Sequence, residues 1–130
     1  MKKDTILFLL TCVLILLTFY IFGLKINAKE IELIPMDATA YCDQGITASG
    51  EHVRVGICAM RKDLIGKTAI VYSQENGVVT GLIGIYEIKD TGGHELIKTG
   101  KCVDIFMWDK NSCFQFGRQK VLVQILDAVG

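Results

Sequence analysis

Two aspartates, Asp90 and Asp104, are the residues best suited by type and spacing to acid–base chemistry. Asp90 follows an apolar segment and opens an Asp-Thr-Gly-Gly motif, whose glycines allow a sharp turn and the close approach of a ligand. Asp104 lies between Val103 and Ile105 in a strand pattern, so its side chain must point away from theirs. Two carboxylates in one groove would raise the pKa of one and create a general acid. The structural alternative is that Asp90 caps a turn and Asp104 is solvated.

Other short patterns lack a defining residue of the motif that they approach. The segment 66–68, Gly-Lys-Thr, ends like a phosphate-binding loop, but Arg61 stands where the first glycine is needed. The segment 94–98 begins like a zinc-protease helix but has Lys98 in place of the second histidine. Four cysteines follow the N-terminal segment without a Cys-x-x-Cys pair: Cys42, Cys58, Cys102 and Cys113. The sequence does not distinguish between the three possible disulfide pairings of these cysteines, and we expect several of them to be small buried thiols. We expect no metal and no cofactor.

The elements that must position the two aspartates are short strands. Residues 34–42 alternate between apolar and more polar side chains, which is typical of a half-buried strand. Further strands are expected at 56–59, 68–72, 82–88, 102–107 and 120–126. The Asn76-Gly77 pair predicts a hairpin turn, and only 109–116 is predicted helical, with Asp109 as N-cap and Gly117 as its end. The pattern predicts an all-β domain, a small barrel or sandwich.

An uncharged run at residues 6–24 precedes this domain. As a helix of ~1.5 Å per residue it would span about 28 Å, close to the hydrocarbon core of a bilayer. A cleaved signal peptide is one interpretation, but the run is longer than a usual signal core, and Ile26 occupies a position where cleavage needs a small residue. A retained anchor is favoured. We therefore expect a transmembrane helix at 1–24, a linker at 25–33 and a domain at 34–130 that is extracellular and faces the cell wall.

Charge is distributed unevenly between these parts. Residues 1–29 hold four basic side chains and one acidic, whereas residues 30–130 hold ten basic and thirteen acidic. A mildly acidic domain lacks the basic face that nucleic acids require, so we expect no nucleic-acid partner.

Five segments fall together in the order found in a known family. They are Ala-Thr-Ala-Tyr-Cys at 38–42, Thr-Ala-Ser-Gly at 47–50, Asp-Thr-Gly-Gly at 90–93, Val-Asp-Ile at 103–105 and Phe-Gly-Arg-Gln-Lys-Val at 116–121. Over residues 36–127 the chain resembles the three-aspartate (3D) domain family. That domain is related to the catalytic part of membrane-bound lytic transglycosylase A and to the stationary-phase survival muralytic proteins of Gram-positive bacteria.

The resemblance implies a small double-psi β-barrel that cleaves the MurNAc–GlcNAc link of peptidoglycan glycan strands to 1,6-anhydro products. It assigns Asp90 as the acid–base and Asp104 as its neighbour in the groove. It further implies that Thr39, Tyr41, Thr47, Gly92 and Gly93 line the groove. Lys67 is added as a possible contact for sugar or peptide carboxylates, and a monomer is expected.

Two departures from the family pattern bear on these expectations. The third family aspartate is expected near positions 60–61, where this chain has Met60 and Arg61, with Asp63 a few residues late. The loop from Gly93 to Asp104 is about three residues longer than usual, with 94–96 as the extra residues. A non-catalytic wall-binding barrel is therefore a second interpretation, and a small structural membrane protein is a third.

Overall fold

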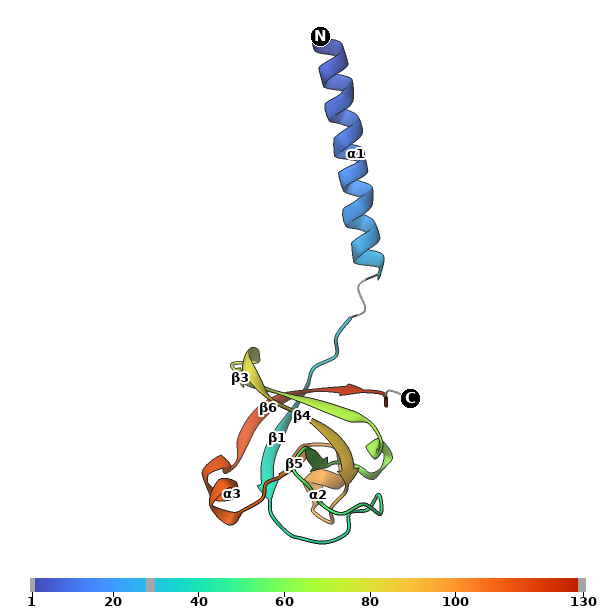
Figure 1. Cartoon of the computed structure of the whole chain (residues 1–130). Coiled ribbons are helices and arrows are strands. Elements are labelled where there is room, and N and C mark those ends of the chain that lie inside the picture. The colour runs from blue at the N-terminus through green and yellow to red at the C-terminus, as the bar shows by residue number, and fades with distance from the viewer. Residues whose placement is uncertain (1, 28–29, 129–130) are drawn as a thin grey trace. The chain divides into compact units, whose positions relative to one another are not determined.

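The computed structural model describes residues 2–27 and 30–128, which form two compact units, 1–31 and 32–130. Residues 28–29 of the predicted linker and 129–130 of the predicted domain lie outside the described residues. In chain order the elements are α1 (Lys3–Asn27), β1 (Ile34–Tyr41), β2 (Ile57–Ala59), the 3-10 turn η1 (Lys62–Leu64), β3 (Thr68–Glu75), β4 (Val78–Asp90), α2 (Glu95–Lys98), β5 (Cys102–Phe106), α3 (Lys110–Phe116) and β6 (Gln119–Leu126) (Figure 1).

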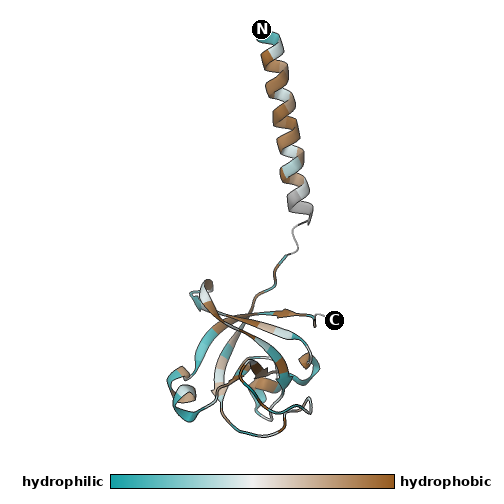
Figure 2. Ribbon diagram, in the orientation of Figure 1, coloured by the Kyte–Doolittle hydropathy of each residue, from teal (hydrophilic) through white to brown (hydrophobic). Residues whose placement is uncertain are grey.

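Helix α1 carries apolar side chains around its whole circumference, as Figure 2 shows along most of its length. Its segment Lys3–Gly23 is long and apolar enough to cross a membrane, a property that signal sequences share. The helix runs three residues past Leu24, where the sequence predicted its end. A helix that is apolar on all sides has no polar face to offer water, which fits a lipid environment.

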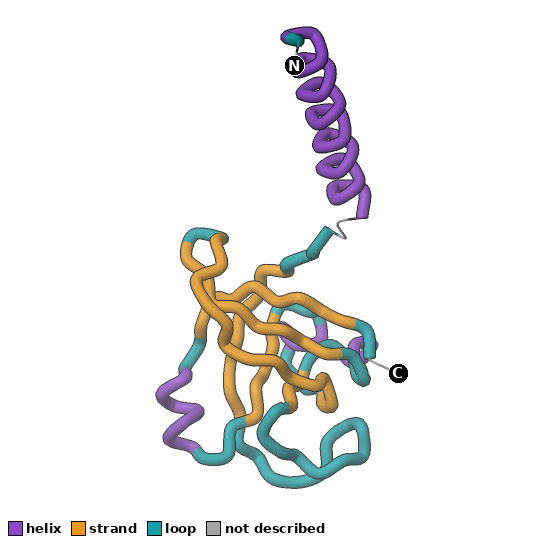
Figure 3. The backbone as a smooth tube through the Cα atoms, turned by 45° about the horizontal axis from the view of Figure 1, so that its top comes forward, coloured by secondary structure: helices purple, strands orange, loops and turns teal. Residues whose placement is uncertain are grey.

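The second unit is a closed barrel of six strands, ordered β1-β5-β2-β4-β3-β6. The pairs β1–β5 and β2–β4 are parallel, and the other four pairs are antiparallel. Closure leaves no open sheet edge. The long loop between β1 and β2 and helix α2 gather at one end of the barrel (Figure 1), and Figure 3 shows this loop in teal below the strands. The expected all-β barrel is therefore confirmed at the level of a closed six-stranded barrel.

The interior of the barrel follows the alternation read from the sequence. Met36 and Ala38 of β1 are buried, as are Val103 and Ile105 of β5. The remaining buried core residues come from the other strands and the residue after β2: Cys58, Met60, Ala69, Val71, Ile88, Val121 and Val123. Each large apolar side chain removed from water stabilises the fold by roughly 1.5–3 kcal/mol. Cys58 and Cys102 are buried free thiols, as expected.

The predicted turns and caps form as the local sequence indicates. Asn76 and Gly77 adopt positive φ angles of 52° and 80°, which a two-residue hairpin turn requires. At α3 the Asp109 side chain accepts a hydrogen bond from the Ser112 backbone N–H at 2.8 Å, and Gly117 ends the helix with a φ of 63°.

Helix α2 was not predicted, so the expectation of a single helix in this domain was wrong. His94 is its N-cap, and the His94 Nδ1 accepts from the Leu96 backbone N–H at 3.2 Å. The helix has only four residues, which is too short for an apolar periodicity to appear in the sequence. Its N-cap and first two residues coincide with 94–96, the stretch that the sequence marked as extra relative to the family that it resembles.

Candidate active site

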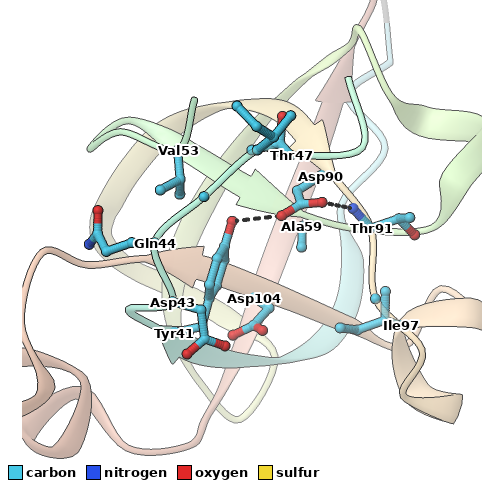
Figure 4. Close-up of a pocket in the computed structure, with 13 residues that line it drawn as sticks. Tyr41, Asp43, Gln44, Thr47, Val53, Ala59, Asp90, Thr91, Ile97 and Asp104 are labelled. Carbon is cyan, nitrogen blue, oxygen red and sulfur yellow. Dashed lines mark hydrogen bonds between the residues drawn. The ribbon is translucent and has the colours of Figure 1, made fainter. Parts of the chain in front are cut away.

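A cavity of about 260 Å³ opens at the end of the barrel where β5, β2 and β4 lie side by side. Its lining residues come from these strands, from the end of β1, from the β1–β2 loop and from the β4–β5 connection with its helix α2 (Figure 4): Tyr41, Asp43, Gln44, Gly45, Ile46, Thr47, Val53, Ala59, Asp90, Thr91, Gly92, Ile97 and Asp104. Both aspartates that the sequence singled out are among them.

Strand pairing brings the two aspartates together across β2. Ala59 of β2 pairs with Asp104 of β5 on one side and with Asp90 of β4 on the other. Two strand spacings therefore separate the aspartate backbones, or roughly 10 Å. Because Val103 and Ile105 face the core, Asp104 faces the cavity, as the alternation predicted. The small side chain of Ala59 leaves the space between the two carboxyl groups open.

Asp90 is held by three donors. Its Oδ1 accepts from the backbone N–H groups of Ala48 at 3.0 Å and Thr91 at 2.9 Å. Its Oδ2 accepts from the Tyr41 hydroxyl at 3.4 Å, and Figure 4 shows the bonds from Tyr41 and Thr91. Burial raises the pKa of Tyr41, and the charges of Asp90 and Asp104 raise it further. The phenol therefore keeps its proton and donates. Asp90 acts as an acceptor in all three bonds and needs no proton for any of them.

Asp104 lies in a different environment. The Thr39 hydroxyl donates to its Oδ1 at 2.9 Å, and the two residues are paired across β1 and β5. Burial raises the pKa of Asp104 above the ordinary carboxyl value, and the neighbouring charges of Asp43 and Asp90 act in the same direction. The Thr39 hydrogen bond and His94 oppose this rise. The raised pKa of Asp104 favours its protonated form relative to an ordinary aspartic acid.

A third carboxylate, that of Asp43, lines the cavity from the loop after β1, and Figure 4 places it below the Tyr41 ring beside Asp104. Sequence reasoning missed Asp43 as a site residue. Its only signal was its position directly after a strand that carries two predicted groove residues, Thr39 and Tyr41. The position where the third family aspartate was sought does not reach the cavity, because Met60 is buried and Asp63 pairs with Arg61 at 3.0 Å.

The other predicted residues divide between the cavity and its surroundings. Thr47 is buried at the cavity wall, where its hydroxyl donates to the Glu51 carbonyl at 3.0 Å. Gly92 also lines it, and a Cβ there would lie 2.9 Å from Ile97 Cδ1, so a larger residue would require the Ile97 side chain to shift. Gly93 follows Gly92 in the chain but is not among the lining residues.

Lys67, which the sequence analysis named as a contact for carboxylates, does not line this cavity. Its ammonium lies 3.4 Å from Asp127 Oδ1, and it lines a separate hollow with Gly66 and Thr68. Lys67 directly precedes β3, which is separated from β5 and β2 in the barrel order. The sequence could not reveal this separation, because it depends on the order of the strands.

Comparisons with protein-family models, with curated proteins and with solved structures found no match to this chain. Within the residues that the structure describes, no three His, Cys, Asp or Glu side chains are grouped closely enough to hold a metal ion. The chemistry that the geometry can support is acid–base chemistry by a partly buried carboxyl group of raised pKa, Asp104, near a second carboxyl group, Asp90, that three hydrogen bonds hold in place.

Proposed function

We propose that the chain is a membrane-anchored peptidoglycan lytic transglycosylase whose barrel is of the double-psi type and faces the cell wall. The observation that carries the proposal is the pairing of Asp104 with Asp90 across Ala59, at the mouth of one cavity. The two parallel strand pairs of the barrel and the order of the five segments that resemble the 3D family support it. Helix α1, long enough to cross a membrane, supports the anchor.

In this mechanism a single carboxyl group serves twice. The Asp104 carboxylic acid donates its proton to the oxygen that links muramic acid C1 to the next sugar, and the C1–O bond breaks. The resulting carboxylate then takes the proton of the muramic acid 6-hydroxyl as its oxygen bonds to C1. The products are a 1,6-anhydro muramic acid and a glucosamine whose released oxygen carries the proton from Asp104. Water is not consumed, and Asp104 ends protonated as it began.

The contacts favour Asp104 as the proton donor rather than Asp90, to which the family resemblance assigned that role. A general acid must hold a proton near neutral pH, and burial raises the pKa of Asp104 in that direction. The fixed Asp90 carboxylate can instead stabilise the positive charge that develops at C1 as the bond breaks. Its three hydrogen bonds hold it in place for that task.

The proposal is tested by incubating the full-length chain in detergent micelles with purified peptidoglycan and analysing released fragments by mass spectrometry. We expect muropeptides that end in a 1,6-anhydro sugar. Fragments with ordinary reducing ends would contradict the transglycosylase chemistry. Sedimentation with the peptidoglycan without any release would favour the second candidate, a wall-binding barrel, which is motivated by the placement of Asp63 away from the cavity.

A further inference from the structure

A second cavity, of about 230 Å³, adjoins the first. Its lining residues are Thr39, Ala40, His94, Ile97, Cys102, Asp104 and Arg118. Asp104 and Ile97 line both cavities, so the Asp104 carboxyl group stands at the junction between them. A chain of sugars passing over Asp104 would place one ring toward each cavity.

The two cavities differ in charge. The first is lined by three acidic side chains and, among its described lining residues, by no basic one. The second adds a guanidinium, that of Arg118, and an imidazole, that of His94, to the shared Asp104. Sugar substituents of opposite charge would therefore be sorted to opposite sides of Asp104.

Both basic side chains keep hydrogen-bond donors available. Arg118 uses Nε to donate to Asp37 Oδ2 at 3.1 Å, and within the described part of the chain its Nη groups make no hydrogen bond. His94 Nδ1 is an acceptor for the Leu96 backbone N–H, which places the proton of the neutral ring on Nε2. Half of the Arg118 side chain is exposed, so a ligand can reach it.

We propose that Arg118 and His94 form a carboxylate-binding subsite that receives the carboxylate carried by the muramic acid residue whose glycosidic bond lies over Asp104. The inference rests on the proposed function, because muramic acid is the sugar of that glycan that bears a lactyl ether. This ether ends in a free carboxylate in stem-free strands and continues into a peptide stem with its own carboxylates elsewhere. Guanidinium and imidazole N–H groups bind carboxylates through short, charge-assisted hydrogen bonds.

The subsite would fix which sugar lies on each side of Asp104. Muramic acid would occupy the second cavity, and the neighbouring glucosamine would lie in the acidic first cavity, from which the muramic acid carboxylate would be repelled. The linkage over Asp104 would then always join a muramic acid on the Arg118 side to a glucosamine on the Asp90 side.

The experiment measures binding of the full-length chain in detergent micelles, in an Asp104→Asn background so that bound strands are not turned over. The probes are a stem-free tetrasaccharide of alternating MurNAc and GlcNAc, the same strand with peptide stems, and chitotetraose, which has no carboxylate. At least one muramic-acid strand should bind about 10-fold more tightly than chitotetraose, as expected for a charge-assisted hydrogen bond. Tighter binding of only the stem-free strand identifies the lactyl carboxylate, and of only the stem-bearing strand the peptide carboxylates. Equal binding of all three probes would overturn the inference.

Variants assign the effect to the subsite. Arg118→Gln should abolish most of the preference for muramic acid, while Lys120→Gln should keep it. Lys120 is the matched control, because it also pairs with Asp37, at 3.3 Å, but does not line the second cavity. His94→Asn, which preserves an N-cap side chain for α2, should reduce the preference by a smaller factor and provides a second route if Arg118→Gln does not fold. An undiminished preference in folded Arg118→Gln would refute the subsite.

Release of anhydro-muropeptides by the chain with its native Asp104 is measured in parallel, so that the two proposals fail separately. Absence of a preference for muramic acid together with normal release would refute the subsite alone. A preference for muramic acid without any release would refute the cleavage reaction alone.

Discussion

Replacement of Asp104 by Asn should abolish muropeptide release while leaving the barrel folded. The amide has nearly the same shape and can still accept the hydrogen bond that Thr39 donates at 2.9 Å, but it is not a general acid. General acid–base catalysis contributes ~10²–10⁴-fold, or about 3–5 kcal/mol of activation free energy, and here the same group acts in both steps. We expect at least a 100-fold loss of anhydro-muropeptide release, measured by mass spectrometry over a time course.

The pH dependence of stability provides a check that is independent of catalysis. The pKa of Asp104 is raised in the folded state, so its contribution to stability is complete below the unfolded pKa of about 4 and is lost as the pH rises through the folded pKa. The variant does not titrate at this position. The melting temperature of Asp104→Asn, relative to that of the native chain, should therefore rise as the pH increases from 4 to 7.

Asp63→Asn is the matched control, because Asp63 is an exposed aspartate outside the cavity. A hydrogen bond from Arg61 lowers the pKa of Asp63, so its stabilising contribution is present above pH 4 and is lost as the pH falls. The control should keep full activity, and its melting temperature relative to the native chain should stay nearly constant from pH 4 to pH 7 and rise only below pH 4. A folded Asp104→Asn chain with native activity would refute the assignment of Asp104 as the acid.

Three further predictions concern the groove and the anchor. Asp43→Asn removes a like charge that raises the pKa of Asp104, so a smaller fraction of Asp104 should be protonated at pH 7 and the alkaline limb of the pH–rate profile should move toward acid. Asp90→Asn can keep an amide oxygen on the Ala48 and Thr91 N–H groups but removes the negative charge, so release should fall by at least 10-fold, and the weaker hydrogen bonds should also lower the melting temperature, as circular dichroism would report. In wall-free cells, added protease should digest residues 30–130 of the intact protein; full protection would contradict the outward orientation, and a mature N-terminus near Lys29 would contradict the anchor.

Local sequence determined much of the architecture. The uncharged run of α1, the alternation of β1, the Asn76-Gly77 turn and the capped helix α3 each depend on neighbouring residues, and each appears where it was predicted. The outward direction of Asp104 was likewise fixed by its position between two core residues. These features could be read because a period or a cap is contained within a few residues of chain.

The composition of the candidate site was decided by the tertiary structure. Asp90 and Asp104 meet because β2 lies between β4 and β5 in the barrel, and that order is not written in any local pattern. The same order excluded Lys67 and brought in Asp43. The raised pKa of Asp104 depends on burial by residues distant in sequence, so it could be assigned only from the tertiary structure. Strand order depends on non-local packing of side chains across the core, whereas propensity and capping act within single elements.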